Sequence, residues 1–198
     1  MASKILVVCT GNVCRSPLAE GLLRRALNER FGDDAPDVAS AGTAAWEGSG
    51  AMPESVRAAA ERGVDIADHV ARLLTQALVA QADLLVGMAV EHRDAVGDLV
   101  PEAAARSFTL KELVRLLEAL PPGAGPARGP GLEARVGEAD ALRRRGSEGN
   151  PWDEDVVDPL GMPLDTYRAI AWELDGWTDR LVEGLFGPVP AVVPGEDV

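Results

Sequence analysis

The stretch KILVVCTGNVCRSPLAEGLLRRAL (residues 4–27) contains the signals of a strand, a loop and a helix in direct succession. In residues 4–8, Lys4 is followed by four apolar side chains, three of them β-branched, without polar alternation, which is typical of a strand covered on both faces. Pro17 suits the first turn of a helix, because its missing N–H would have no partner there. Apolar side chains then recur at helical spacing, at Leu18, Leu22, Ala26 and Leu27. The stretch therefore predicts a central strand that leads through a loop into a helix.

The alternation of strands and helices continues along the chain. Short buried strands are expected at residues 37–41 and 84–88, with helices at 53–62 and 76–82 between them. A capping box that starts at Thr109 and an apolar stripe from Tyr167 to Leu185 indicate two further helices. This order predicts an α/β fold with a doubly wound, flavodoxin-like, four-stranded parallel sheet and helices on both faces.

A single domain is expected over residues 1–187. A chain of 198 residues, 46% of them hydrophobic, is long enough to close one sizeable core. The pattern breaks down at about 121–150, where 132–145 could form a short charged helix, and we interpret this segment as a flexible insertion. A passive linker is the alternative, although the segment leads toward Asp158. Residues 188–198 are expected to form a disordered tail.

Charge and cysteine content restrict the partners of the chain. A formal net charge of -13 argues against nucleic acid, because a polyanion would be repelled. No apolar run approaches the length that spans a bilayer, so membrane insertion is not expected. Two cysteines, Cys9 and Cys14, make a disulfide framework implausible and favour a cytoplasmic location. A metal site would need two more ligands, and His69 and His92 are unsuitably spaced, so no metal or cofactor is expected.

Residues 9–16 have the composition of an anion-binding loop. Between the carboxyl end of a strand and the start of a helix, free backbone N–H groups and the helix dipole favour phosphate. Gly11 and Asn12 tolerate the left-handed conformation, so the loop can turn its amides inward. Arg15 presents a planar fork of donors that matches two oxygens of a phosphoryl group. The expected phosphate-binding loop also comprises Thr10, Val13, Cys14 and Ser16.

Cys9 is the candidate nucleophile. A thiol among these donors and near Arg15 should be stabilised as the thiolate, the nucleophilic form. A lone cysteine after a strand is more often a packing residue, but the spacing to Arg15 and the strand–loop–helix context favour catalysis. Ser16 can cap the helix or donate to the thiolate, and the sequence leaves both roles open.

Residues 9–17 resemble the active-site loop, Cys-x5-Arg-Ser, of the low-molecular-weight protein-tyrosine-phosphatase family. Residues 40–43 and the pair Asp158-Pro159 resemble two further blocks of that family, so that most of residues 4–186 is covered. The resemblance implies a phosphatase that acts on a phosphorylated protein without metal. Cys9 would form a phosphocysteine, Arg15 would stabilise the transition state, and Asp158 would serve as general acid and then general base.

The resemblance also implies roles for residues around the loop. Asn12, Ser40 and His69 match positions that form a hydrogen-bond network in this family, although a merely satisfied histidine would look much the same. Cys14 matches a position where some members form a protective disulfide with the nucleophile. Trp46 resembles an aromatic wall of the substrate pocket, or is only a half-buried surface residue.

Some positions depart from the family pattern. Leu160 stands where tyrosine-specific members usually place an aromatic side chain, and we expect it to line the pocket with Trp46. Val13 is aliphatic where related protein-arginine phosphatases usually have Thr. Residues 153–155 are acidic, and one of them could be the true acid in place of Asp158; we interpret them as solvated surface.

Hydrolysis of phosphotyrosine on proteins is the predicted function. Protein-arginine phosphatase is the alternative enzyme, and a non-catalytic phosphoprotein-binding module is the alternative from another class. A thioredoxin-coupled arsenate reductase ranks lower, because it needs resolving cysteines that this chain lacks beyond Cys14.

Overall fold

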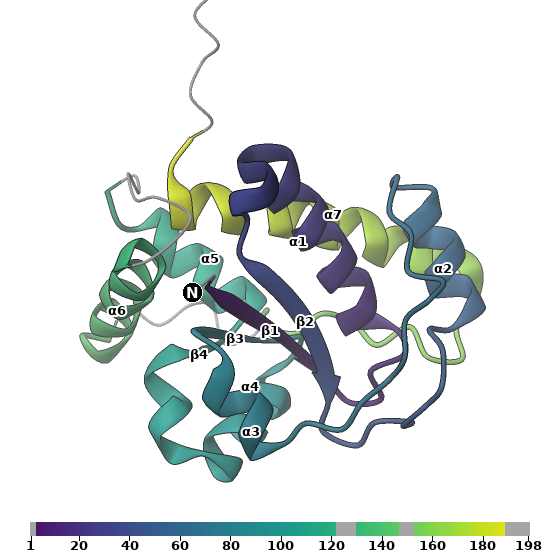
Figure 1. Ribbon diagram of the computed structural model, residues 1–198, viewed down its shortest axis with the longest axis horizontal. Coiled ribbons are helices and arrows are strands. Elements are labelled where there is room, and N and C mark those ends of the chain that lie inside the picture. The colour runs from purple at the N-terminus through teal and green to yellow at the C-terminus, as the bar shows by residue number, and fades with distance from the viewer. Residues whose placement is uncertain (1–2, 122–129, 147–152, 189–198) are drawn as a thin grey trace, which may run out of the picture.

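In the computed structural model, which describes residues 3–121, 130–146 and 153–188, four strands form a parallel sheet between two layers of helices (Figure 1). The strands are β1 (Lys4–Cys9), β2 (Asp37–Gly42), β3 (Leu84–Gly87) and β4 (Ser107–Thr109). Their order is β2-β1-β3-β4, and all neighbours pair in parallel. The prediction of a doubly wound α/β fold is therefore confirmed.

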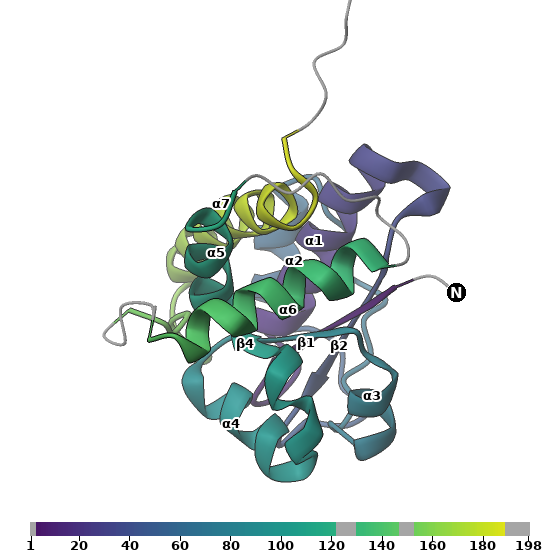
Figure 2. The ribbon, with the colours of Figure 1, turned by 90° about the vertical axis from the view of Figure 1, so that its left-hand side faces the viewer.

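Helices cover both faces of the sheet (Figure 2). One face carries α1 (Arg15–Phe31), α2 (Pro53–Ala60), α5 (Leu110–Glu118) and α7 (Leu164–Phe186). The other carries α3 (Gln76–Gln81) and α4 (Val90–Leu99), and short 3-10 helices occupy Gly32–Asp34 and Pro101–Arg106. Ile5 and Val7 of β1 pack into the first layer, whereas Leu6 and Val8 pack into the second. Strand β1 is thus buried on both faces, as its continuous apolar run predicts.

The sequence pattern indicates α5 clearly but does not indicate α4 or β4. At the start of α5 the predicted capping box is confirmed: the Thr109 hydroxyl accepts from the Glu112 N–H, and the Glu112 carboxylate accepts from the Thr109 N–H. Strand β4 has only three residues, too few for a periodic pattern. Helix α4 buries only His92 and Val96, so it lacks a broad apolar stripe.

Helix α6 (Pro130–Arg144) lies within the segment that we expected to be a flexible insertion. Its side chains Leu132, Val136 and Ala139 are buried in the main core, where α6 contacts α5 and α7. This part of the segment therefore contributes to the core, which differs from the expectation; its many charged residues hide a narrow apolar stripe. The other parts of the insertion and tail predictions fall on 122–129, 147–152 and 189–198, which lie outside the described residues.

The carboxyl ends of the strands meet at one edge of the sheet, as parallel pairing requires. Strand β1 ends at Cys9 beside Gly42 of β2, and Val8 lies beside Gly87 of β3. The backbone continues this contact beyond β3, where Met88 N donates to the Val8 carbonyl at 2.8 Å. The loops that follow β1, β2 and β3 are therefore neighbours.

Candidate active site

The loop of residues 9–16 (the anion loop) has its backbone carbonyls turned outward. Carbonyls of Cys9, Thr10, Gly11 and Val13 accept hydrogen bonds from N–H groups of the segment 43–52, at 2.8–3.0 Å. Because the N–H and C=O of a peptide point in opposite directions, the N–H groups that follow these carbonyls point toward the inside of the loop. The anion loop is thereby shaped as a ring of inward donors, which suits a phosphate.

Two residues allow this tight turn. Asn12 has a φ of 56°, the left-handed conformation that the sequence led us to expect for it. Gly42, at the end of β2, lies so close to the loop that a Cβ there would come 2.5 Å from the Thr10 carbonyl oxygen. A side chain at position 42 would therefore push β2 away from the anion loop.

The side chain of Asn12 holds the anion loop to its surroundings. Its amide nitrogen donates to the hydroxyls of Ser16, at 2.9 Å, and Ser40, at 2.8 Å. Its amide oxygen accepts from Arg72 N at 2.9 Å, and its backbone carbonyl lies 2.7 Å from His69 Nε2. The structure thus brings together Asn12, Ser40 and His69, the three residues predicted to support the loop.

The sulfur of Cys9 sits among hydrogen-bond donors. Asn12 N donates to it at 3.3 Å, and the Ser16 hydroxyl lies 2.9 Å away. Ser16 already accepts from the Asn12 amide, which leaves its own hydrogen free to donate to the sulfur. Ser16 makes no capping bond at the start of α1, so its position favours the role beside the thiol over the role of helix cap.

Arg15 connects the anion loop to Asp158. The buried guanidinium donates from Nη1 to the Val156 carbonyl at 3.1 Å and from Nη2 to Asp158 Oδ2 at 2.7 Å. Its Nη2 also lies 3.4 Å from the Thr10 hydroxyl. The Asp158 side chain is 46% exposed, and it therefore faces both the guanidinium and solvent. The predicted nucleophile, arginine and acid thus converge at one edge of the sheet.

Residues 153–160 (the acid segment) are anchored by the acidic residues that precede Asp158. Asp153 pairs with Lys111 at 3.0 Å and with Arg115 at 2.7 Å, both on α5. Glu154 is buried and lies 3.5 Å from Arg93 of α4. Burial and the neighbouring Glu112 raise the pKa of Glu154 above its usual value.

The third acidic residue holds the acid segment to the start of α4. Asp155 Oδ1 accepts from Val90 N at 2.8 Å, and Val156 N donates to the Met88 carbonyl at 2.7 Å. Such a carboxylate at a helix N-terminus satisfies a free N–H and interacts favourably with the helix dipole. The interpretation of residues 153–155 as solvated surface is therefore wrong for Glu154, which is buried, whereas Asp153 and Asp155 are exposed as expected. All three carboxylates also bind specific partners, because the segment lies against α4 and α5.

His92 is a site residue that sequence reasoning missed. It lies in the first turn of α4, is 1% exposed, and places Nε2 2.9 Å from the Thr10 hydroxyl. Burial, and secondarily the charge of Arg15, lowers the pKa of His92 to about 4. Spacing along the chain gives no signal for this contact, since Thr10 and His92 follow different strands.

The two predicted pocket residues lie on different sides of the site. Trp46 is 49% exposed and its backbone N–H donates to the Gly11 carbonyl, so it stands next to the anion loop. Leu160 is 43% exposed and its N–H donates to Asp158 Oδ1 at 3.1 Å. Both side chains border the site, and their contact with a substrate stays a prediction.

Cys14 differs from Cys9 in its surroundings, although both are buried free thiols. The Cys14 sulfur lies 3.8 Å from the hydroxyl of Tyr167 on α7. Burial raises the pKa of the Cys14 thiol to about 11. Cys14 is therefore a protonated packing residue at neutral pH, and its predicted disulfide with Cys9 stays a prediction.

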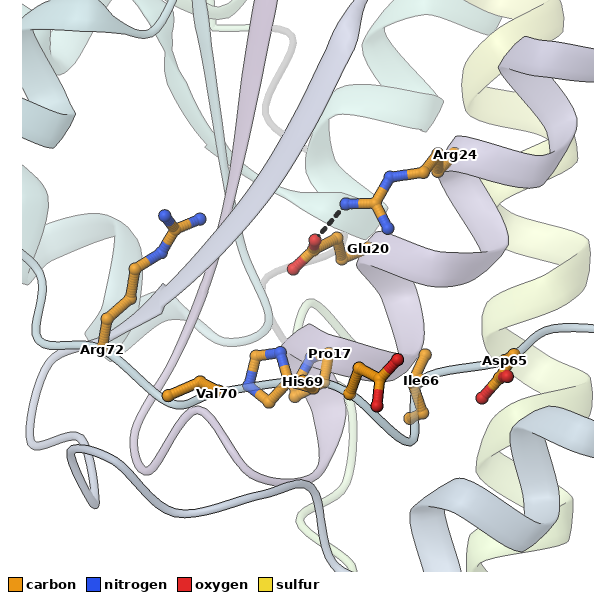
Figure 3. A pocket seen from close by; sticks show the side chains of 9 residues that line it. Pro17, Glu20, Arg24, Asp65, Ile66, His69, Val70 and Arg72 are labelled. Atoms are coloured by element: carbon orange, nitrogen blue, oxygen red, sulfur yellow. Dashed lines mark hydrogen bonds and ion pairs between the residues drawn. The ribbon is translucent and has the colours of Figure 1, made fainter.

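A separate hollow of about 290 Å³ lies beside His69 (Figure 3). Its walls come from the start of α1 and from the segment 65–72, with Glu20 and Arg24 paired on one side. Cys9, Arg15 and Asp158 do not line it. The hollow thus adjoins the support of the anion loop without being part of the site.

Within the described residues, no helix is long and apolar enough to cross a membrane. The same part of the chain contains no cluster of three or more His, Cys, Asp or Glu side chains arranged to hold a metal ion.

Comparison with known proteins identifies the family. Residues 4–119 match the model of the low molecular weight phosphotyrosine protein phosphatase family. The chain belongs to this family. The resemblance inferred from residues 9–17 is therefore confirmed, and the protein is a phosphatase of the low-molecular-weight type.

Relatives within the low-molecular-weight family differ in their substrates. The chain is 32% identical to the protein-arginine-phosphatase of Geobacillus stearothermophilus over 185 residues, which cover 93% of this chain and 97% of that protein. It is 40% identical over 113 residues to EpsP of Ralstonia solanacearum, a probable low molecular weight protein-tyrosine-phosphatase, covering 57% and 74% of the two chains.

Solved structures of the low-molecular-weight family also match this chain. A mutant of YwlE from Bacillus subtilis superposes with a TM-score of 0.68 at 27% identity, over 93% of this chain and 99% of that one. The low molecular weight protein tyrosine phosphatase from T. tengcongensis superposes with a TM-score of 0.67 at 34% identity, over 92% and 99%.

Proposed function

We propose that this phosphatase hydrolyses phosphotyrosine on proteins through a phosphocysteine intermediate formed at Cys9. The observation that carries the proposal is the convergence of the Cys9 sulfur, the inward amides of the anion loop and the Arg15–Asp158 pair. The donors on the sulfur, Asn12 N and the Ser16 hydroxyl, stabilise negative charge there.

In the first step, the Cys9 thiolate attacks phosphorus to form the sulfur–phosphorus bond, and the bond from phosphorus to the leaving oxygen breaks. The loop amides and Arg15 bind the remaining phosphoryl oxygens and stabilise the charge that spreads over them. The protonated carboxyl of Asp158 donates its proton to the leaving oxygen. When a phosphoryl oxygen takes the place of Asp158 on Arg15, the carboxyl group is released toward that oxygen.

In the second step, Asp158 as carboxylate accepts a proton from water while the water oxygen attacks phosphorus. The sulfur–phosphorus bond breaks and inorganic phosphate leaves. In this scheme Asp158 is the only side chain that changes its protonation state, and no group is oxidised or reduced. Because Cys9 must remain a free thiol, we also propose a cytoplasmic location.

Two features support tyrosine as the substrate residue. The half-exposed indole of Trp46 beside Gly11 offers a face on which an aromatic ring can stack. Val13 presents an aliphatic side chain within the anion loop and contributes no hydrogen bond for a guanidinium group.

Phosphoarginine is the second candidate substrate, and one observation favours it. The match to the protein-arginine-phosphatase extends over 93% of this chain, whereas the match to EpsP extends over 57%. The C-terminal half, which includes the acid segment, is therefore covered by the arginine-phosphatase relative.

The test compares phosphate release from p-nitrophenyl phosphate, a phosphotyrosine peptide and a phosphoarginine peptide. We expect Cys9→Ser to abolish turnover, and Asp158→Asn to lower kcat by about a hundredfold. Asp37→Asn is the matched control, because Asp37 is an exposed carboxylate at the opposite end of β2, and it should match wild type.

The outcomes separate the candidate functions. Faster hydrolysis of the phosphoarginine peptide would replace the tyrosine proposal with the arginine one. A wild-type protein that binds phosphate without turnover would show a phosphoprotein-binding module and contradict the enzymatic proposal.

A further inference from the structure

The buried imidazole of His92 touches the anion loop through one nitrogen only. Its Nε2 lies 2.9 Å from the Thr10 hydroxyl and 3.3 Å from a carboxylate oxygen of Glu91. Its Nδ1 is buried and has no hydrogen-bond partner among the residues that the structure describes. Two oxygens that can accept a hydrogen therefore face Nε2, and none faces Nδ1.

This asymmetry assigns the ring hydrogen. A neutral imidazole carries its hydrogen on one nitrogen, and a buried N–H without an acceptor is rare in folded proteins. We therefore place the hydrogen on Nε2. The lowered pKa of His92 keeps the ring neutral at physiological pH, because burial and Arg15 oppose a second proton more strongly than Asp155 and Asp158 favour it.

The assignment fixes what the Thr10 hydroxyl can do. A hydroxyl has two lone pairs and one hydrogen. Its oxygen faces two donors, His92 Nε2–H at 2.9 Å and Arg15 Nη2–H at 3.4 Å. With both lone pairs engaged by donors, the hydrogen of Thr10 is left to donate to a third group.

We infer that His92 is a positioning residue that directs the Thr10 hydroxyl as a donor to the phosphoryl group bound between the anion loop and Arg15. The inference rests on the proposed phosphate site and adds a side-chain donor to its backbone amides. A hydrogen bond to a charged oxygen is among the stronger ones in proteins, so this donor adds measurably to phosphate binding.

Gly87 allows His92 to lie close to the anion loop. A Cβ on Gly87, at the end of β3, would come 3.0 Å from Arg93 N and 3.3 Å from the Cβ of His92. The absence of a side chain at Gly87 lets the first turn of α4 pack against the anion loop. The contact between Thr10 and His92 therefore depends on β1 and β3 being neighbours.

The test uses paired variants that keep or remove one hydrogen bond each. Thr10→Ser keeps the hydroxyl and Thr10→Val removes it at similar volume. His92→Gln keeps an N–H near the position of Nε2, and His92→Leu removes it. For each variant, and for the double variant Thr10→Val/His92→Leu, we would measure the Kd for inorganic phosphate, kcat and KM for p-nitrophenyl phosphate, and Tm.

We expect Thr10→Val and His92→Leu each to weaken phosphate binding by about tenfold, and the double variant to be no weaker than Thr10→Val alone. Thr10→Ser and His92→Gln should remain within about threefold of wild type. If His92→Leu does not fold, the phosphate Kd values of Thr10→Val, Thr10→Ser and His92→Gln still test the inference. Of these three variants, only Thr10→Val should weaken phosphate binding.

Three results would overturn the inference: a phosphate Kd for Thr10→Val equal to that of wild type, additive effects in the double variant, or a His92→Leu variant with a lower Tm and unchanged Kd. Because phosphate binding is measured separately from turnover, a protein that binds phosphate without hydrolysing a monoester would contradict the proposed function alone.

Discussion

The anion loop and the acid segment both reach Arg15, but they are held in place differently. The anion loop lies between a strand and a helix of its own, and its shape depends on Asn12, whose φ of 56° turns the chain. The acid segment has no regular secondary structure around Asp158, and it binds side chains and backbone of α4 and α5 and the carbonyl of Met88, which follows β3.

We expect the anion loop to determine phosphate binding and the acid segment to determine proton transfer. The anion loop presents its backbone donors from one short stretch of chain, although the segment 43–52, Ser40 and Arg72 help to hold its shape. The acid segment has to present one carboxyl group at a fixed place, and its position depends on contacts far apart in the sequence. Variants should therefore affect phosphate binding in one region and kcat in the other.

Arg15 lies in the anion loop and contacts the acid segment, so its replacement should have the largest effect. In Arg15→Lys the charge remains, but the fork that bonds the Val156 carbonyl and Asp158 is lost. We expect kcat/KM for p-nitrophenyl phosphate to fall by a hundredfold or more, roughly the effect of removing a preorganised donor. Arg24→Lys, a partly exposed change on the same helix, serves as the control, and equal effects of the two changes would refute the assignment.

Asn12→Ala should break the anion loop alone. It removes hydrogen bonds to Ser16, Ser40 and Arg72 N, which should lower the free energy of unfolding by about 2–3 kcal/mol and weaken phosphate binding. Chemical denaturation and phosphate titration measure the two effects. Asn12→Gly is the matched variant, since it loses the same bonds but tolerates the positive φ, and it should be about 1 kcal/mol more stable than Asn12→Ala.

Asp155→Ala should loosen the acid segment alone. It removes the bond to Val90 N at the start of α4, and we expect kcat to fall by about threefold to tenfold because Asp158 is less well placed. The Kd for inorganic phosphate should stay within twofold of wild type. The comparison requires the two regions to be separable. If phosphate affinity fell in parallel with kcat, they would not be separable and the comparison would fail.

Cys14 gives the smallest and most specific effect, on stability at high pH. Because burial raises the pKa of this thiol from its ordinary value of 9.0 to about 11, the folded protein keeps a proton that the unfolded chain loses. This contribution to stability is fully present below pH 9 and is lost as the pH rises toward 11, at about 1 kcal/mol per pH unit. Cys14→Ala should remove this part of the slope in denaturation curves; an unchanged slope would contradict the burial of the thiol.

The sequence alone located much of the fold and of the site. The order of apolar strands and helices predicts the parallel sheet, and the spacing of Cys9, Arg15 and Ser16 predicts the anion loop, because strand, loop and helix signals depend on near neighbours. Even Asp158 was placed through a short local motif. Trp46 and Leu160 also border the site as expected, although their contact with a substrate is untested.

Tertiary structure decided the rest, because it depends on which strands are neighbours. Only the pairing of β1 with β3 brings His92 against Thr10, and only the packing of α4 and α5 buries Glu154 and gives the exposed Asp153 and Asp155 their partners. Helix α6 follows the same rule, since its charged sequence gains a buried stripe only through contact with α5 and α7. The local sequence thus predicted the residues that we propose to bind phosphate, and long-range packing decided which groups hold them in position.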